Sequence, residues 1–138
     1  MVLALGRVLV VDDEPQVGQL LRELLGELGY TVKTAIRGDE ALQLVPVFQP
    51  DAILLDLQMP GMSGVQVLDR LRRDHHDIPV IILTANTDVD VARGTLTRGA
   101  FDYLRKPFDL DVLSRTVAAA VIVAPGADRA GRDDRLAT

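Results

Sequence analysis

The chain alternates between short apolar runs and longer segments in which apolar residues recur every three or four positions. The short runs, rich in β-branched residues, lie at 8–11, 31–36, 52–57, 80–84 and 101–104. Apolar runs of this length, bounded by turn residues, are typical of buried β-strands. The pattern therefore predicts five strands, with a helix after each.

The first helical segment has the clearest period. Its apolar residues recur at three- and four-residue steps: Val17, Leu20, Leu21, Leu24, Leu25 and Leu28. This spacing places them on one face of a helix, and Gly29 suits its C-terminal end. A third helix is expected after Ser63, which is a favourable N-cap residue. A fifth is expected over 109–124.

The second and fourth helices are predicted to be weaker. The second begins at Gly38, but Pro46 lacks an amide hydrogen and is expected to end or kink it, which would shorten it. The fourth, over 88–97, carries Gly94 in its interior, at a cost of about 1 kcal/mol relative to alanine.

Strands too apolar to face water on either side, alternating with helices, indicate a parallel sheet covered on both faces. We predict a flavodoxin-like, doubly wound α/β fold with five strands in the order 2-1-3-4-5. Residues 1–124 are expected to form one domain. Residues 125–138 contain one leucine and no aromatic residue, so they are expected to be a disordered tail or a severed linker.

The amino-acid composition excludes several classes of function. The net charge of −5 argues against direct binding of nucleic acid, which depends on neutralising phosphates. There is no cysteine, which excludes disulfides and thiolate metal sites. No apolar run approaches the roughly 18 residues needed to cross a membrane. We expect a cytoplasmic protein with no membrane contact.

Polar residues stand where the predicted strands end. Asp12 and Asp13 follow the first strand, Asp56 lies at the end of the third, and Thr84 and Lys106 lie at the ends of the fourth and fifth. In an open parallel sheet the functional crevice lies beyond the carboxyl ends of the strands. We expect these five side chains to face one pocket.

Clustered carboxylates require an explanation, because two of them about 4 Å apart repel by roughly 4 kcal/mol at an effective dielectric constant of 20. Oxygen ligands without histidine or cysteine favour a hard cation, and Mg²⁺ fits best. Asp56 is the best candidate for a nucleophile that attacks phosphorus, because Asp12 and Asp13 already share the metal. Lys106 could neutralise phosphoryl oxygens, and Thr84 could donate a hydrogen bond to one of them.

Four motifs, "VLVVDDEP", "ILLDLQMPGMSG", "VIILTA" and "GAFDYLRKPF", resemble the receiver domain of bacterial two-component response regulators over about residues 7–123. The resemblance implies that Asp56 accepts a phosphoryl group from a sensor histidine kinase or a phosphotransfer protein. It also implies that Asp13, Asp56 and the Gln58 carbonyl bind Mg²⁺ directly, and that Asp12 acts mainly through a bound water.

By the same resemblance, Lys106 pairs with the phosphoryl oxygens, Thr84 moves to bond one of them, and Tyr103 turns inward as Thr84 withdraws. The peptide before Pro107 would be cis. The face made by the fourth helix, fifth strand and fifth helix would carry the signal to a downstream output domain or protein, or form a phosphorylation-dependent homodimer contact. The chain would not be an enzyme, and its activity would be limited at most to its own phosphorylation and dephosphorylation.

The sequence leaves two alternatives to a receiver function, and both are disfavoured. An aspartate-based phosphohydrolase of the haloacid dehalogenase type needs a second aspartate two residues after the nucleophile, where this chain has Glu14 after Asp12 and Gln58 after Asp56. A docking module that works without phosphate is disfavoured by the complete set of site residues. His75 and His76 are interpreted as a solvated loop pair, because no third metal ligand lies nearby in the sequence.

Overall fold

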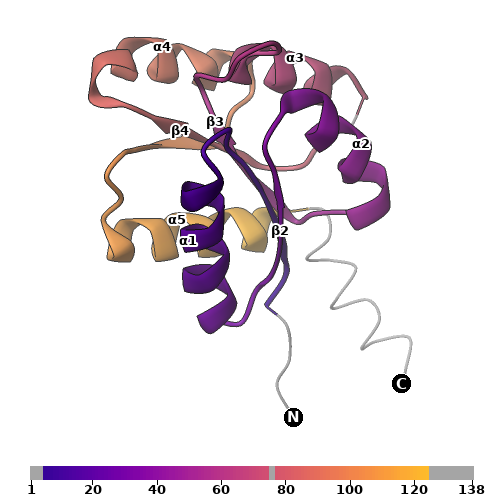
Figure 1. Ribbon diagram of the computed structural model, residues 1–138, viewed down its shortest axis with the longest axis vertical. Coiled ribbons are helices and arrows are strands. Elements are labelled where there is room, and N and C mark those ends of the chain that lie inside the picture. The colour runs from indigo at the N-terminus through magenta and orange to yellow at the C-terminus, as the bar shows by residue number, and fades with distance from the viewer. Residues whose placement is uncertain (1–4, 75–76, 125–138) are drawn as a thin grey trace.

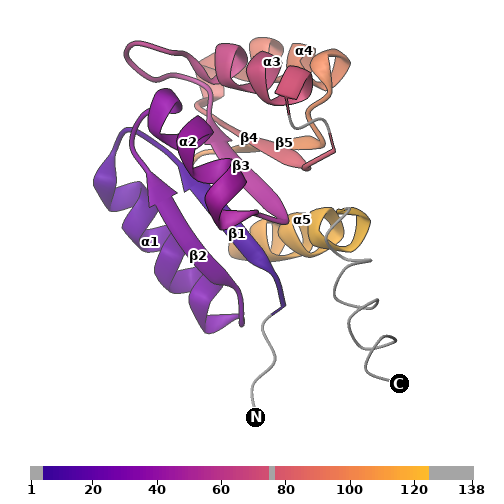
Figure 2. The same cartoon turned by 90° about the vertical axis from the view of Figure 1, so that its right-hand side faces the viewer.

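The computed structural model describes residues 5–74 and 77–124, which form a central parallel sheet with helices on both faces (Figures 1 and 2). The strand order is β2-β1-β3-β4-β5, which confirms the predicted order and fold class. The strands are β1 (Arg7–Val11), β2 (Thr31–Ala35), β3 (Ala52–Asp56), β4 (Val80–Thr84) and β5 (Asp102–Arg105). Each boundary lies within one residue of its predicted position.

In the described part of the chain, five α-helices cover the sheet: α1 (Pro15–Glu27), α2 (Gly38–Phe48), α3 (Gly64–Asp74), α4 (Val89–Gly94) and α5 (Leu110–Val123). Helices α1 and α5 lie on one face, and α2, α3 and α4 lie on the other (Figure 2). Strands β3 and β4 are buried along their whole length. Alternate residues of each strand enter opposite core layers, as Leu54 and Leu55 do.

Helix α3 begins with a reciprocal cap. The Ser63 Oγ accepts a hydrogen bond from the Gln66 amide at 3.3 Å, and the Gln66 Oε1 accepts one from the Ser63 amide at 2.9 Å. This arrangement satisfies two amides that a helix N-terminus otherwise leaves unpaired. Ser63 therefore caps the helix as the sequence predicts.

The expectation that Pro46 shortens α2 is wrong. The helix continues past Pro46 to Phe48 and ends at Gln49, whose φ is +54°. Val45 and Phe48 are buried in the core on either side of the exposed proline. Their burial offsets the hydrogen bond that proline cannot donate, so tertiary packing outweighs the local preference.

The segment expected to form a weak fourth helix is divided into three short pieces. A 3₁₀ turn (Asn86–Asp88) precedes α4, and a second 3₁₀ turn (Thr95–Arg98) follows it. Helical hydrogen bonding of the α type stops at Gly94, in agreement with the low helix propensity of glycine. The longest piece therefore has only six residues.

Within 5–74 and 77–124, no helix has the length and apolar character needed to span a membrane. The interpretations of His75 and His76, and of residues 125–138 as a tail or linker, concern segments outside the described residues.

Candidate functional site

Parallel pairing of neighbouring strands brings the three aspartates together. Val11 of β1 pairs with Leu55 of β3, so the residues that follow them, Asp12 and Asp56, leave the sheet side by side. Asp12, Asp13 and Asp56 each present a carboxylate oxygen, and these oxygens lie within 4.8 Å of one another. The side chains of Asp12 and Asp56 are almost fully buried.

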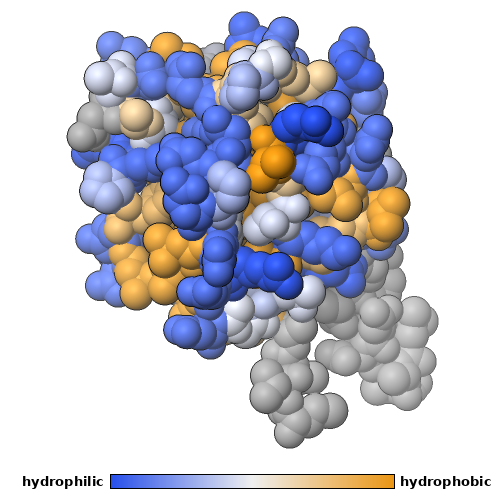
Figure 3. All heavy atoms as spheres, in the orientation of Figure 1, coloured by the Kyte–Doolittle hydropathy of each residue, from blue (hydrophilic) through white to orange (hydrophobic). Residues whose placement is uncertain are grey.

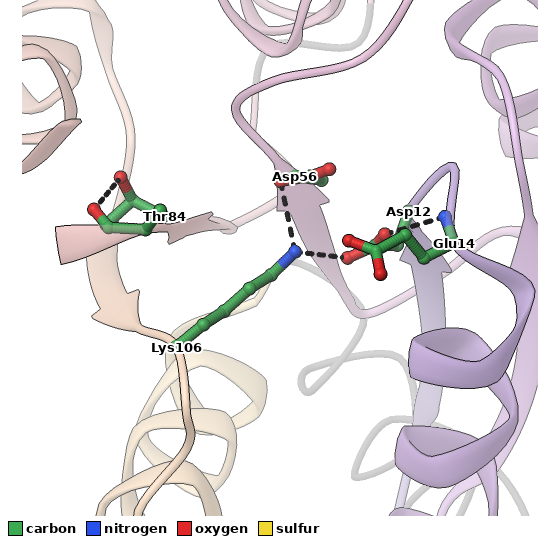
Figure 4. A network of polar contacts seen from close by, with 6 residues as sticks. Asp12, Glu14, Asp56, Thr84 and Lys106 are labelled. Carbon is green, nitrogen blue, oxygen red and sulfur yellow. Dashed lines mark hydrogen bonds and ion pairs between the residues drawn. The ribbon is translucent and has the colours of Figure 1, made fainter. Parts of the chain in front are cut away.

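Lys106 reaches the same place from the end of β5. Its Nζ lies 2.8 Å from Asp12 Oδ2 and 3.3 Å from Asp56 Oδ1 (Figure 4). Its backbone amide donates to the Thr84 carbonyl at 2.8 Å, which ties the exit of β5 to the end of β4. The Lys106–Pro107 peptide is cis, as the family resemblance implies.

The site perturbs both charges at its centre. Burial and the nearby charge of Asp12 raise the pKa of Asp56 to about 6, although Lys106 opposes the increase. Burial alone would lower the pKa of Lys106, but its hydrogen bond to Asp12 and the charges of both carboxylates leave it above its ordinary value. The lysine therefore stays protonated at neutral pH, and the charged form of Asp56 is destabilised relative to a free aspartate.

Glu14 also contributes to the site, although nothing in the sequence singled it out. Its backbone amide donates to Asp12 Oδ1 at 3.0 Å, while its side chain is exposed. The Asp12 amide in turn donates to the Ala35 carbonyl at 3.0 Å. These two bonds fix the first carboxylate, and because both donors are backbone amides, the side chain of Glu14 gives no sign of them in the sequence.

Thr84, Tyr103 and Gln58 are the other residues predicted for the site. Thr84 is buried at the end of β4, and its hydroxyl donates to the Ala85 carbonyl at 3.1 Å (Figure 4). Tyr103 is partly buried and packs against the core layer under α3 and α4. Gln58 is exposed, two residues after Asp56.

The donor set fits a hard divalent cation. Among the described residues, the cluster combines three carboxylates with one ammonium, so it carries excess negative charge, and its candidate ligand atoms are all oxygens. A site with few carboxylates and room for water or a phosphate oxygen favours Mg²⁺ over a dedicated Ca²⁺ cage. Burial is the main cause of the raised pKa of Asp56, and the nearby charge of Asp12, which Lys106 only partly offsets, adds to it.

A parallel sheet with acidic residues and a lysine at its carboxyl edge defines the class of this protein. A family model described as the response regulator receiver domain matches residues 8–118, and the chain belongs to this family. It is a signalling class and not a classical enzyme, and the match favours this assignment over the phosphohydrolase alternative.

Bacterial regulatory proteins are among those similar to this chain. The chain is 40% identical over 116 residues to the DNA-binding transcriptional regulator NtrC of Escherichia coli, covering 84% of the chain and 25% of NtrC. It is 44% identical over 107 residues to the response regulator MprA of Mycobacterium ulcerans, covering 78% of the chain and 46% of MprA. The chain thus spans about a quarter to a half of the length of these relatives.

Solved structures agree. The receiver domain of NtrX from Brucella abortus superposes with a TM-score of 0.81 at 29% identity, covering 85% of this chain and 99% of that one. A response regulator receiver domain from Clostridium thermocellum gives a TM-score of 0.80 at 35% identity, covering 86% of this chain and 94% of that one.

Proposed function

We propose that Asp56 is the phosphoryl acceptor of this receiver domain. The observation that carries the proposal is the position of Lys106 Nζ, 2.8 Å from Asp12 and 3.3 Å from Asp56. An ammonium held over two buried carboxylates at the edge of the sheet is suited to neutralise a phosphoryl group bonded to one of them. Asp56 ends the central strand β3, whereas Asp12 makes the shorter bond to Lys106 and also accepts a hydrogen bond from the Glu14 amide.

The chemical step is a transfer of phosphorus from nitrogen to oxygen. An ionised Asp56 oxygen attacks the phosphorus of a phosphohistidine on a sensor histidine kinase or phosphotransfer protein. An oxygen–phosphorus bond forms, the phosphorus–nitrogen bond breaks, and the imidazole keeps the electron pair and takes up a proton. With a pKa of about 6, Asp56 is mostly ionised at neutral pH, as this attack requires.

We propose Mg²⁺ as the resident cation, held by Asp13, Asp56 and the Gln58 carbonyl, with Asp12 acting mainly through water. When bound, the ion supplies positive charge next to the transferring phosphoryl oxygens. The convergence of three carboxylate oxygens within 4.8 Å supports the assignment.

The signal is proposed to leave through α4, β5 and α5. Thr84 would exchange its bond to the Ala85 carbonyl for one to the phosphoryl group, and Tyr103 would turn inward as Thr84 withdraws. The partners would be a downstream output domain or protein, or a second phosphorylated copy of the chain. Because the net charge is −5, contact with DNA is assigned to an output partner and not to this domain. A cytoplasmic location stays a prediction.

The direct test is intact mass after incubation with acetyl phosphate, with and without Mg²⁺. We expect one added phosphoryl group, about 80 Da, on the wild type with Mg²⁺ and none on Asp56→Asn. Asp74→Asn, an exposed change at the end of α3, is the matched control and should be modified like the wild type. The same experiment tests self-phosphorylation, and the later loss of the added mass tests self-dephosphorylation. Modification of Asp56→Asn at the wild-type rate would refute the acceptor assignment.

A further inference from the structure

Helix α3 begins in contact with the peptide of the proposed acceptor. Its first residue, Gly64, leaves no room for a side chain: a Cβ there would lie 2.3 Å from the Asp56 carbonyl oxygen and 2.8 Å from the Leu57 Cα. It would also lie 3.1 Å from the Asp56 carbonyl carbon. All three atoms belong to the backbone, so no side-chain rotation can relieve the overlap.

Gly64 is required for space and not for backbone conformation. The loop between β3 and α3 contains a second glycine, Gly61, whose φ of +76° lies in the left-handed region, and no atom lies within 4 Å of its Cβ position. Gly64 is not among the residues with positive φ. The two glycines therefore have different roles: Gly61 permits the turn of the loop, and Gly64 permits the close approach of α3 to the backbone of Asp56 and Leu57.

Neither partner in the contact can move away freely. Strand β3 is paired on both sides, and the Leu57 amide donates to the Leu83 carbonyl at 2.9 Å. Helix α3 is anchored in the core by three fully buried side chains, those of Val67, Leu68 and Leu71. The Gly64 amide donates to the Leu57 carbonyl at 3.0 Å.

To reach ordinary van der Waals contact at 3.4 Å, a Cβ at position 64 must move away from the Asp56 carbonyl oxygen by about 1.1 Å. Because the strand and the helix are both held, the displacement falls on the peptide of Asp56 and on the loop of residues 57–63. That loop contains Gln58, whose carbonyl is a proposed metal ligand. The Asp56 side chain and the Gln58 carbonyl, which are both proposed to bind the cation, would then change their positions relative to each other.

We infer that Gly64 is a positioning residue for phosphoryl transfer, which acts by letting α3 close against the backbone of Asp56. The inference rests on the proposed function, because it assigns Gly64 a role in placing the acceptor. A misplacement near 1 Å can lower the rate of a positioned reaction by about 100-fold. Loss of support around a metal ligand typically weakens metal affinity by roughly tenfold or more.

The test compares Gly64→Ala with Gly29→Ala in the full chain. Gly29 lies at the turn between α1 and β2, at the opposite end of the sheet from Asp56, and its φ of +109° makes alanine strained there. Both variants are expected to lose stability in urea. Only Gly64→Ala is expected to bind Mg²⁺ roughly tenfold more weakly by calorimetry. Only that variant should show a rate of modification by acetyl phosphate about 100-fold lower at saturating Mg²⁺.

Each outcome decides the question. Equal Mg²⁺ affinity and equal rate for the two variants would overturn the inference, since Gly64 would then contribute to stability alone. If Gly64→Ala does not fold, the comparison is repeated with both variants carrying Gly26→Ala as a stabilising second substitution and with a stabilising osmolyte in the buffer. Gly26 is chosen because a Cβ there meets no atom within 4 Å. If the Gly64→Ala variant still does not fold under these conditions, the inference is overturned. A wild type that binds Mg²⁺ but is not modified would contradict the proposed function, while the Mg²⁺ comparison would still test Gly64.

Discussion

The ammonium of Lys106 lies closer to Asp12 than to Asp56, at 2.8 Å against 3.3 Å (Figure 4). The positive charge of Lys106 thus partly neutralises Asp12 as well as Asp56, the proposed acceptor. Asp12 is the more deeply buried of the two carboxylates, so its charge is the more expensive to leave unpaired. The relationship makes Lys106 a stabilising residue even before any phosphoryl group arrives.

Lys106→Met is therefore expected to destabilise the protein without divalent cations. Removing one partner from a buried ion pair leaves an uncompensated charge, which costs about 3–5 kcal/mol when the pair is fully buried. Because the Lys106 side chain is 22% exposed, we expect a smaller loss, on the order of 1–3 kcal/mol at pH 7.5, in the free energy of unfolding measured in urea. Mg²⁺ should restore more stability to this variant than to the wild type, because the cation replaces the missing positive charge. Arg105→Met, at the exposed neighbouring position, is the control, and an equal loss there would contradict the explanation.

The acceptor itself should make stability depend on pH. The pKa of Asp56 is about 6 in the folded protein against an ordinary 3.8, so the folded state binds more protons than the unfolded state between these values. Stability from this group is therefore present below pH 3.8 and is lost as pH rises through about 6. Without divalent cations, Asp56→Asn should exceed the wild type in stability by on the order of 2 kcal/mol at pH 7.5.

The difference between Asp56→Asn and the wild type should shrink as pH falls towards 4, since a protonated aspartate is as neutral as asparagine. Comparing the two proteins cancels the titration of carboxylates that do not interact with Asp56. The difference in the free energy of unfolding is measured in urea at pH 4.5, 6 and 7.5, with Asp74→Asn as an exposed control. A difference that is constant across this range would show that the folded protein does not raise the pKa of Asp56.

The sheet was predictable because its three central strands, β1, β3 and β4, are short and apolar, and because each strand is followed by a helix of clear or partial period. Strand ends then placed Asp12, Asp56 and Lys106 at one edge, since parallel strands end on the same side. Sequence patterns could go this far because they encode which residues are buried. They contain no direct information on which side chains meet after folding.

The features that could not be predicted depend on contacts between distant segments. Pro46 stands within a helix because buried neighbours hold the last turn, against its local preference. The contact of Gly64 with the Asp56 backbone depends on how closely a helix meets a strand. The amide of Glu14 holds Asp12 through an atom that every residue but proline carries.

Gly94 should govern how easily α4 rearranges. Its φ of −62° and ψ of −25° are helical, and a Cβ there would meet no atom within 4 Å. Gly94→Ala should therefore raise the free energy of unfolding by about 0.5–1 kcal/mol, chiefly by restricting the unfolded chain. Hydrogen exchange of the α4 amides should slow, and the phosphorylated fraction at steady state should fall, because the face becomes harder to rearrange.

Gly26→Ala in α1 is the matched control for Gly94. It is also helical with open space around its Cβ, so it should give a similar gain in stability. It should change neither the exchange of α4 nor the phosphorylated fraction. If Gly94→Ala leaves both of these quantities at their wild-type values, a role for this glycine in the output face is excluded.

The start of α5, on the same proposed output face, depends on one side chain. Asp109 Oδ1 accepts hydrogen bonds from the amides of Asp111 at 2.9 Å and Val112 at 3.2 Å. Asp109→Ala removes both and should lower the free energy of unfolding by about 1 kcal/mol, with faster exchange of amides in the first turn of α5. Glu14 occupies the same position before α1 but makes no side-chain cap bond, so Glu14→Ala should change stability by no more than a few tenths of a kcal/mol. Equal losses in the two variants, measured in urea, would mean that the cap bonds of Asp109 contribute nothing to the stability of the domain.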